Sequence, residues 1–337
     1  MNENKKRETM PLKKIPYGKS NFREIRLGNY YYIDKTSYIE YLEYSDAEYI
    51  VFLRPRRFGK SLFISTLEYY YGIQYKDEFE DIFGGLHIGK KPTLKANSYL
   101  TLLFEFSRID TSTEESTRKG FLSNVRIAVE AFMSVYSTYF AKKEIETVTT
   151  ANSAGEIIKQ LFLLYKTKKI DTPVYILIDE YDHFANELLA FRFNEFSKIV
   201  SENGYVRKFY ETIKTASQEG IVERIFITGV TPITLDSLTS GFNIAKNFST
   251  RRAVNQMQGF THQEVEQLLV QVAKDRKFQL DDTGKIMTDL RKWYDGYLFS
   301  SEAGERMYNS DMILHFITEF SEMQFKKYPK EIIDTNI

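Results

Sequence analysis

The stretch from Glu48 to Ser61, with the sequence EYIVFLRPRRFGKS, decides the fold of this 337-residue chain. After the leading glutamate, residues 49–53 are all aromatic, β-branched or aliphatic, which predicts a short strand buried on both faces. A basic turn follows and ends in Gly59-Lys60-Ser61. Beyond the turn, apolar residues recur at helical spacing, at Leu62, Phe63, Leu67 and Tyr70. The sequence therefore predicts a strand, a glycine turn and a helix in direct succession.

Three further segments have the pattern of buried strands, at residues 99–106, 174–180 and 224–229. Long helical patterns lie between them, at about 114–142 and 192–218. Strands that alternate with long helices are typical of an α/β fold, in which helices cover both faces of a parallel sheet. We therefore expect this architecture for most of the chain.

The chain ahead of the first buried strand gives weaker signals. Residues 1–14 are polar and charged, and we expect a flexible tail there. Tyr30 to Ile33 predicts a short strand. Asp34-Lys35-Thr36 offers a helix cap, and residues 37–44 are expected to be helical.

The pattern changes after about residue 255. Thr261 and Glu264 have the spacing of a capping box, which opens a helix, and a second helix is expected over 283–294. No further buried strand is evident. We therefore predict a core domain over residues 15–255 and a smaller, mainly helical lid domain over 256–337.

The glycine turn has the composition of a phosphate-binding loop. Such loops follow the pattern G-x-x-x-x-G-K-[ST], or Walker A, because backbone N–H groups, a helix N-terminus and a lysine together surround phosphate. Gly59-Lys60-Ser61 completes the second half of the pattern, but Arg54 replaces the first glycine and Pro55 follows it. The candidate nucleotide contacts are Arg56, Arg57, Phe58, Gly59, Lys60, Ser61 and Leu62.

Three arginines and one lysine fall within the seven residues 54–60. We expect this charge to lie where a triphosphate would bind. The alternative is a basic turn with a purely structural role. The position between a buried strand and an amphipathic helix favours nucleotide binding.

The third strand pattern ends in two carboxylates, Asp179 and Glu180, as a Walker B segment does. Mg²⁺ prefers oxygen ligands, so Ser61 and Asp179 are the candidate magnesium residues. Glu180 is the candidate general base that activates water, and Lys60 is counted with the catalytic residues because it contacts phosphate. The alternative is that the two carboxylates only cap a turn.

Other polar residues are weaker candidates. Thr228, at the end of the fourth strand pattern, could contact the γ-phosphate or the water, with Thr231 in reserve, although a threonine that only closes a strand is equally consistent. Arg251-Arg252 could act as an arginine finger in trans or reach the phosphates in cis, but a solvated pair is favoured. Asp34-Lys35-Thr36 either contacts the base or caps a helix. The four histidines are scattered, and we assign none a catalytic or metal role.

The composition excludes several classes of protein. Without cysteine, the chain has no disulfides, thiolate zinc sites, iron–sulfur clusters or cysteine nucleophiles. The 46 basic residues balance 46 acidic ones, so no overall field attracts nucleic acid or anionic lipid. No apolar run is long enough for a membrane span, and the N-terminus lacks the apolar core of a signal peptide. We expect a soluble cytoplasmic protein that does not act at a membrane.

With these residues, the chain resembles the predicted AAA-ATPase-like family of bacteria, and the resemblance runs through nearly the whole chain. The matching segments are IPYG at 15–18, YIDKT at 32–36, RPRRFGKS at 54–61, LIDEYD at 177–182, TGV at 228–230, SGFN at 240–243, GFT at 259–261, WYDGY at 293–297 and YN at 308–309. The arginine in place of the first glycine is part of the family's own pattern.

The resemblance implies a P-loop ATPase core of the additional-strand type, followed by a helical lid. Relatives commonly continue into a PD-(D/E)XK nuclease-like domain, for which we find no motif here. Residues 328–337 look like a segment that continues in relatives, so we expect a truncated C-terminus and credit no nuclease activity to this chain.

These observations favour a Mg²⁺-dependent ATP-binding protein that hydrolyses ATP and regulates an effector domain outside this chain. One alternative is a nucleotide-dependent interaction domain without hydrolysis. A second is a nucleic-acid-binding module that uses the cluster Arg54–Arg57, against which the balanced charge argues. The sequence does not fix the oligomeric state.

Overall fold

The computed structural model describes residues 11–191, 204–232, 244–294 and 296–330. The β-strands are β1 (Tyr49–Leu53), β2 (Leu100–Glu105), β3 (Val174–Asp179), β4 (Val222–Gly229) and β5 (Lys246–Asn247). The α-helices are α1 (Phe22–Leu27), α2 (Ser37–Tyr44), α3 (Lys60–Tyr71), α4 (Phe79–Phe83), α5 (His87–Lys90), α6 (Glu114–Val135), α7 (Lys142–Thr149), α8 (Ala154–Thr167), α9 (His183–Phe191), α11 (Tyr205–Gln218), α13 (His262–Asp275), α14 (Thr283–Tyr294) and α15 (Ser310–Glu322). The 3₁₀ helices are η1 (Ile73–Glu78) and η2 (Arg252–Val254).

The strands form one parallel sheet in the order β2-β3-β4-β1-β5, which confirms the predicted α/β architecture. Leu53 pairs with Gly229, and Glu105 pairs with Asp179. The carboxyl ends of β1, β2, β3 and β4 therefore meet at one edge of the sheet. This edge carries the glycine turn after β1 and the carboxylates Asp179 and Glu180 at the end of β3.

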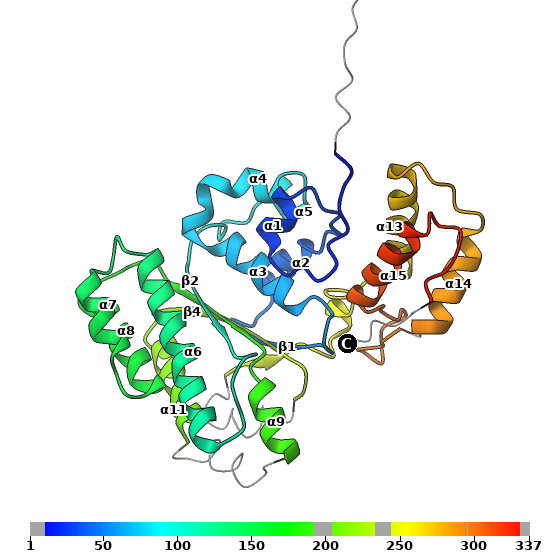
Figure 1. Ribbon diagram of the computed structural model, residues 1–337. Helices are drawn as coiled ribbons and strands as arrows, with labels where there is room; N and C mark the ends of the chain where they lie inside the picture. The colour runs from blue at the N-terminus through cyan, green and yellow to red at the C-terminus, as the bar shows by residue number, and fades with distance from the viewer. Residues whose placement is uncertain (1–10, 192–203, 233–243, 295, 331–337) are drawn as a thin grey trace, which may run out of the picture.

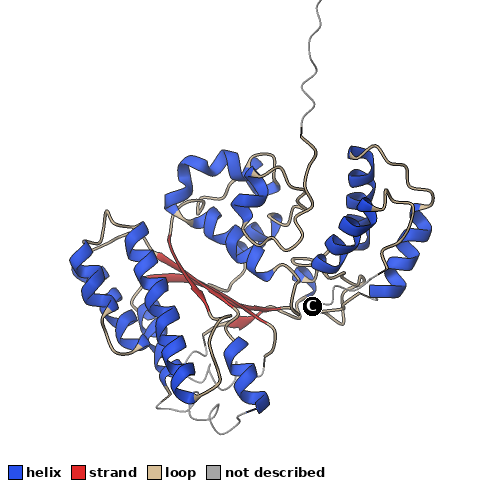
Figure 2. Ribbon diagram, in the orientation of Figure 1, coloured by secondary structure: helices blue, strands red, loops and turns tan. Residues whose placement is uncertain are grey.

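Helices cover both faces of the sheet, as Figures 1 and 2 show. One face packs against α6, α8, α9 and α11, and the other packs against α1, α2, α3, α4 and α5. Successive residues of β3 alternate between the two cores: Ile176 belongs to the first and Leu177 to the second. This alternation explains why β3 is apolar from Val174 to Ile178.

A third hydrophobic cluster joins α13, α14 and α15, which lie beside the sheet domain in Figure 1. Tyr31 belongs to this cluster, and Ile15, Tyr17 and Ile33 pack against it. The Tyr31 hydroxyl also donates a hydrogen bond to Asp275 on α13 at 2.9 Å. The N-terminal segment therefore packs against the C-terminal helices.

The predicted strand from Tyr30 to Ile33 is wrong. Only Tyr30 forms a β-bridge, with Lys14, and the next residues have no regular structure. A strand needs a neighbouring strand that pairs with its backbone groups along its length, and this segment has none beyond Tyr30. Successive side chains instead pack against different parts of the protein. Tyr31 packs on the C-terminal helices, whereas Tyr32 packs on the α1 side of the sheet.

The helix predicted over 114–142 ends at Val135, and α7 begins separately at Lys142. Of the helix expected over 192–218, α11 is the described part, since residues 192–203 lie outside the described residues. Residues 240–243 and Asp295, which belong to segments of the family resemblance, lie outside them as well. No helix in the described ranges is long and apolar enough to span a bilayer.

Candidate nucleotide-binding site

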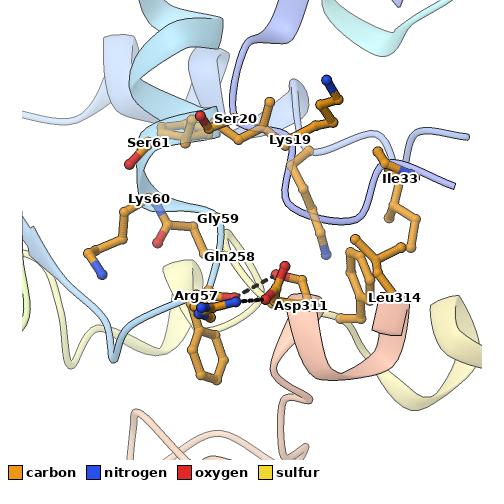
Figure 3. A pocket seen from close by; sticks show the side chains of 18 of the residues that line it. Lys19, Ser20, Ile33, Arg57, Gly59, Lys60, Ser61, Gln258, Asp311 and Leu314 are labelled. Carbon is orange, nitrogen blue, oxygen red and sulfur yellow. Dashed lines mark hydrogen bonds and ion pairs between the residues drawn. The ribbon is translucent and has the colours of Figure 1, made fainter. Parts of the chain in front are cut away.

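A cavity of about 470 Å³ lies beside the glycine turn, a size typical of small-molecule sites. Four parts of the chain line it: the N-terminal segment between Pro16 and Lys35, the turn with the start of α3, Glu180 after β3, and the C-terminal region from Met257 to Leu314. Figure 3 shows Lys60 and Ser61 on one side of this cavity and Ile33 and Leu314 on the other. Of the predicted site residues, it brings together Arg57, Phe58, Gly59, Lys60, Ser61, Leu62 and Glu180.

The backbone of the turn is shaped by two residues with positive φ. Arg57 has φ of +64°, and Gly59 has φ of +85° at the N-cap of α3. Glycine adopts this left-handed conformation without a Cβ clash. Gly59 offers no side chain to cap the helix, so the first N–H groups of α3 remain directed at the cavity. This is the backbone arrangement that binds phosphate in other helix N-termini.

Lys60 is the first residue of α3, and its side chain is only 4% exposed. Its ammonium donates a hydrogen bond to the carbonyl of Pro55 at 3.0 Å. Burial lowers the pKa of Lys60, and the nearby carboxylates of Asp179 and Glu180 partly oppose this effect. A cation is thus held between the turn and the carboxylate pair.

Arg54 does not contribute charge to the cavity, so the expectation that the whole basic cluster faces a triphosphate is wrong for this residue. Its side chain is 1% exposed and donates to the carbonyls of Leu53, Ser249 and Val254 at 2.7–3.0 Å. The guanidinium carbon lies 4.1 Å and 3.9 Å from the ring centres of Phe52 and Phe299. Burial lowers the pKa of Arg54. This arginine connects the sheet to the segments around 249–254 and to residue 299.

The remaining two arginines of the turn differ from each other. The side chain of Arg56 is exposed, and this residue does not line the cavity. Arg57 lines it and forms an ion pair of 2.6 Å with Asp311 in the first turn of α15. Because Arg54 is buried and Arg57 is paired, the arginine cluster does not present the continuous basic surface that nucleic-acid binding would use.

The predicted nucleotide contact Phe58 also has a structural role. Its ring is buried and packs edge-on against Tyr297 at 4.9 Å and Phe299 at 5.2 Å. Its carbonyl accepts a hydrogen bond from the N–H of Gly259 at 3.2 Å. These contacts fix the turn against the C-terminal region.

Asp179 and Thr228 are in direct contact at the edge of the sheet. The Thr228 hydroxyl donates a hydrogen bond to Oδ1 of Asp179, which also accepts from the N–H of Glu180 at 3.0 Å. Both side chains are buried, and neither residue belongs to the cavity lining. Thr228 therefore orients the candidate magnesium ligand rather than extending into the cavity.

Glu180 projects to the cavity wall from a backbone with φ of +50°. Its carboxylate is partly exposed and lies 3.9 Å from Nδ1 of His183. Burial is the main cause that raises the pKa of Glu180, followed by the charge of Asp179. A carboxylate with a raised pKa, open to a cavity, has the properties of a general base.

Asp182 holds the two loops at this edge together, a role that the sequence did not suggest. It is 1% exposed and accepts hydrogen bonds from the backbone N–H groups of Val230 and Thr231 and from Asn186. The Thr231 hydroxyl bonds to Asp182 and Asn186 as well. Thr231, the reserve candidate, therefore serves the loop structure.

The alternatives for two further segments can now be compared. Asp34 accepts from the N–H and hydroxyl of Thr36, which is the N-cap of α2, and from the N–H of His87 at the start of α5, but α2 has no side-chain cap. Lys35 lines the cavity and pairs with Glu264 on α13 at 2.6 Å. Arg251 and Arg252 are exposed, and Arg251 covers the ring of Phe248.

The residues present fit a magnesium ion whose ligands come partly from the protein and partly from a bound nucleotide. Among the described residues, no group of three or more histidine and carboxylate side chains could hold a metal alone. Asp179 uses Oδ1 for Thr228 and Glu180, so its second oxygen remains as a ligand. Ser61 lines the cavity, and Mg²⁺ normally completes its octahedron with phosphate oxygens and water.

Comparison with protein families gives a match to the AAA-ATPase-like family, described as predicted AAA-ATPase, over residues 16–239. That match includes the glycine turn, Asp179, Glu180 and Thr228.

Among curated proteins, the chain is similar to an uncharacterized protein in the vnfD 5′ region of Azotobacter chroococcum mcd 1. The two are 26% identical over 323 residues, which cover 95% of this chain and 54% of that protein. The chain thus spans about half the length of the curated relative that it matches.

Proposed function

Because this chain belongs to the AAA-ATPase-like family, we propose that it binds Mg²⁺-ATP in the cavity beside Lys60 and hydrolyses it to ADP and phosphate. One observation carries the proposal. The phosphate-binding turn and the pair Asp179-Glu180 come from separate strands, and the parallel sheet brings them to one edge, where Glu180 and the turn line the same cavity. The position of β4 between β3 and β1 agrees with a P-loop core of the additional-strand type.

Phosphate binding falls to Lys60 and the N-terminus of α3. The ammonium of Lys60 exchanges its hydrogen bond to Pro55 for a phosphate oxygen, a charge-assisted bond that is stronger than a bond to a neutral carbonyl. The backbone N–H groups that follow Gly59 bind further phosphate oxygens. Negative charge at this position also offsets the unfavourable burial of Lys60.

Ser61 and Asp179 hold the magnesium ion in this proposal, and the ion would neutralise charge on the phosphates. Thr228 keeps the Asp179 carboxylate in a fixed orientation through its hydroxyl. Thr228 is therefore a positioning residue, which revises its expected direct contact with the phosphate or water.

Glu180 accepts a proton from the water that attacks the γ-phosphate. Its raised pKa makes the carboxylate a better proton acceptor than an ordinary glutamate, and its place at the cavity wall gives it access to water. His183 lies close enough to influence the orientation of the carboxylate.

The surroundings of the cavity support a regulatory role. Residues from the proposed lid domain, 256–337, line the cavity together with the turn. Two ion pairs, Arg57–Asp311 and Lys35–Glu264, join this region to the turn and to the N-terminal segment. A nucleotide in the cavity would therefore touch both regions and bias their relative position, which an effector domain outside this chain could sense.

A nucleotide-dependent interaction domain without hydrolysis is the second candidate. Arg57 is the one arginine among the described residues that line the cavity, and it is already paired with Asp311. Efficient phosphoryl transfer usually employs an arginine that stabilises the transition state. In this candidate the same cavity binds ATP, but the protein does not turn it over.

Hydrolysis and binding assays on two variants test the proposal. Glu180→Gln keeps the size of the side chain but removes its basicity, so turnover should fall by about 10²- to 10⁴-fold while the affinity for Mg²⁺-ATP stays within a few-fold. Asp179→Asn should weaken both binding and turnover. Glu130→Gln is the control, since Glu130 is an exposed acid on α6 that does not line the cavity.

The outcomes separate the two candidates. Turnover that is unchanged in Glu180→Gln would refute the role of Glu180 as base. Wild-type protein that binds ATP without measurable phosphate release would support the interaction domain instead of the ATPase.

A further inference from the structure

Gln258 lies in the segment that leads from the sheet domain to α13, and its side chain is 3% exposed. The amide nitrogen and the amide oxygen are both buried, and neither has a hydrogen-bond partner among the described residues. The residue nevertheless lines the cavity beside the glycine turn. Transfer of a carboxamide from water to the protein interior without a hydrogen-bond partner costs free energy. The Gln258 side chain therefore indicates a ligand group that completes its hydrogen bonds.

The backbone beside Gln258 is fixed against the turn. Gly259 has φ of +80°, and a Cβ at this position would lie 2.8 Å from the carbonyl oxygen of Tyr308 and 2.9 Å from the ring of Phe58. The N–H of Gly259 also donates to the carbonyl of Phe58. The position of Gln258 is therefore set by the fold, independently of any ligand.

We propose that Gln258 is the residue that reads the nucleotide base, an inference that rests on the proposed function. A carboxamide presents one donor and one acceptor side by side. The edge of adenine that carries N6 and N7 presents the complementary acceptor and donor, so a glutamine forms two hydrogen bonds with it. The same edge of guanine presents two acceptors, which leaves the amide oxygen of the glutamine unpaired.

The phosphates do not explain this side chain. Phosphate oxygens only accept hydrogen bonds, so they could satisfy the amide nitrogen of Gln258 but not its oxygen. In the proposed function, Lys60 and the N-terminus of α3 supply the phosphate contacts. The buried oxygen therefore needs a donor, which a nucleotide base provides and phosphate does not.

The cavity also has an apolar wall that suits a flat ring. Its members on the side away from Lys60 include Ile33 and Leu314, and Figure 3 shows Gln258 between Lys60 and this pair. Phe260 and Leu268 add further apolar surface to the lining. A heteroaromatic base buries its faces on such side chains while its edge bonds to the amide.

Calorimetric titration of the whole chain with four probes tests this inference: Mg²⁺-ATP, Mg²⁺-dATP, Mg²⁺-GTP and inorganic tripolyphosphate. Gln258→Met has similar volume but no hydrogen-bonding group. We expect it to weaken ATP and dATP binding by about tenfold or more, to weaken GTP binding by less than that, and to change tripolyphosphate binding by less than about twofold. Gln256→Met is the matched control, because Gln256 is exposed, bonds to Glu305 and should leave ATP binding unchanged.

The melting temperature of each variant shows whether Gln258 has a structural role, because loss of a structural side chain would lower Tm. The amide of Gln258 has no partner in the free protein, so Gln258→Met should not lower Tm. A lower Tm with equal weakening of all four probes would overturn the inference in favour of a structural role. Unchanged ATP affinity would overturn it as well.

Two further results separate the possible failures. If wild type prefers ATP over dATP and Gln258→Met abolishes that preference, the amide reads the ribose and the base assignment is wrong. If wild type binds tripolyphosphate but does not distinguish ATP from GTP, the phosphate site stands and Gln258 is not a base reader. Wild type that binds none of the probes would contradict both the proposed function and this inference.

Discussion

The guanidinium of Arg57, in the glycine turn, lies 2.6 Å from the carboxylate of Asp311, near the N-terminus of α15. Three hydrogen bonds accompany this ion pair, because Asn309 donates to the carbonyl of Arg56, and both Ser310 and the N–H of Asp311 donate to the carbonyl of Arg57. The start of α15 is therefore attached directly to the loop that is proposed to bind phosphate.

Asp311→Asn should release Arg57 toward the cavity. We expect the affinity for Mg²⁺-ATP to rise a few-fold, since a cation becomes available to the phosphates. The free energy of unfolding should fall by no more than about 1 kcal/mol, because the pair is partly exposed. Calorimetry and urea denaturation measure the two effects. Glu322→Gln, the control, makes the same charge change in the last turn of α15 and should alter neither ATP affinity nor stability. A loss of ATP affinity in Asp311→Asn would instead show that the ion pair supports the nucleotide-bound state.

Arg54→Lys should destabilise the protein although the charge is kept. The guanidinium donates to three backbone carbonyls and lies between two aromatic rings, and an ammonium cannot reproduce this geometry. We expect a loss of at least about 2 kcal/mol in urea denaturation. The exposed neighbour Arg56 provides the control, because Arg56→Lys should leave stability unchanged. Equal stability of both variants would contradict the structural role of Arg54.

Glu180→Gln should alter how stability depends on pH. Burial raises the pKa of Glu180 above its ordinary value of 4.5, whereas the unfolded chain has the ordinary value. Between these two values the folded protein binds more protons, so the free energy of unfolding falls as pH rises through the window. The variant lacks this titration and should be more stable than wild type above the window.

Urea denaturation at pH values from about 4 to about 8 measures this difference. Glu115→Gln is a control of the opposite sign, because the exposed pair with Lys119 lowers the pKa of Glu115. A Glu180→Gln variant that is less stable than wild type at neutral pH would show that the charged carboxylate is favourable in the fold, against the burial argument.

Strands β1 to β4 were predictable because each is a short, mainly apolar run, whereas β5 is the exposed pair Lys246–Asn247, which has no such pattern and was not predicted. The ends of β1 and β3 fall within one residue of the expected bounds, and the capping box at Thr261 and Glu264 is present as predicted. Helix α15 was not predicted, although it joins the C-terminal cluster. Its N-cap, Asn309, was noted only as part of a matching segment.

The individual roles in the site were less predictable because they depend on distant partners. The turn sequence groups Arg54 with Arg57, but carbonyls of Ser249 and Val254, about 200 residues away, hold Arg54 in the interior. Nothing local marks Gln258 either. Its importance follows from its burial beside a cavity, which only the folded chain creates.

Titration calorimetry with Mg²⁺-ATP on wild type and Lys60→Ala tests the central claim most directly. Lys60 is the cation that the fold places at the start of α3, so its loss should weaken binding by at least about tenfold, or ~1.4 kcal/mol. Lys119→Ala, on the exposed face of α6, is the control and should bind as wild type does. Equal ATP affinity in wild type and Lys60→Ala, or no binding to wild type at all, would contradict the assignment of this cavity as the nucleotide site.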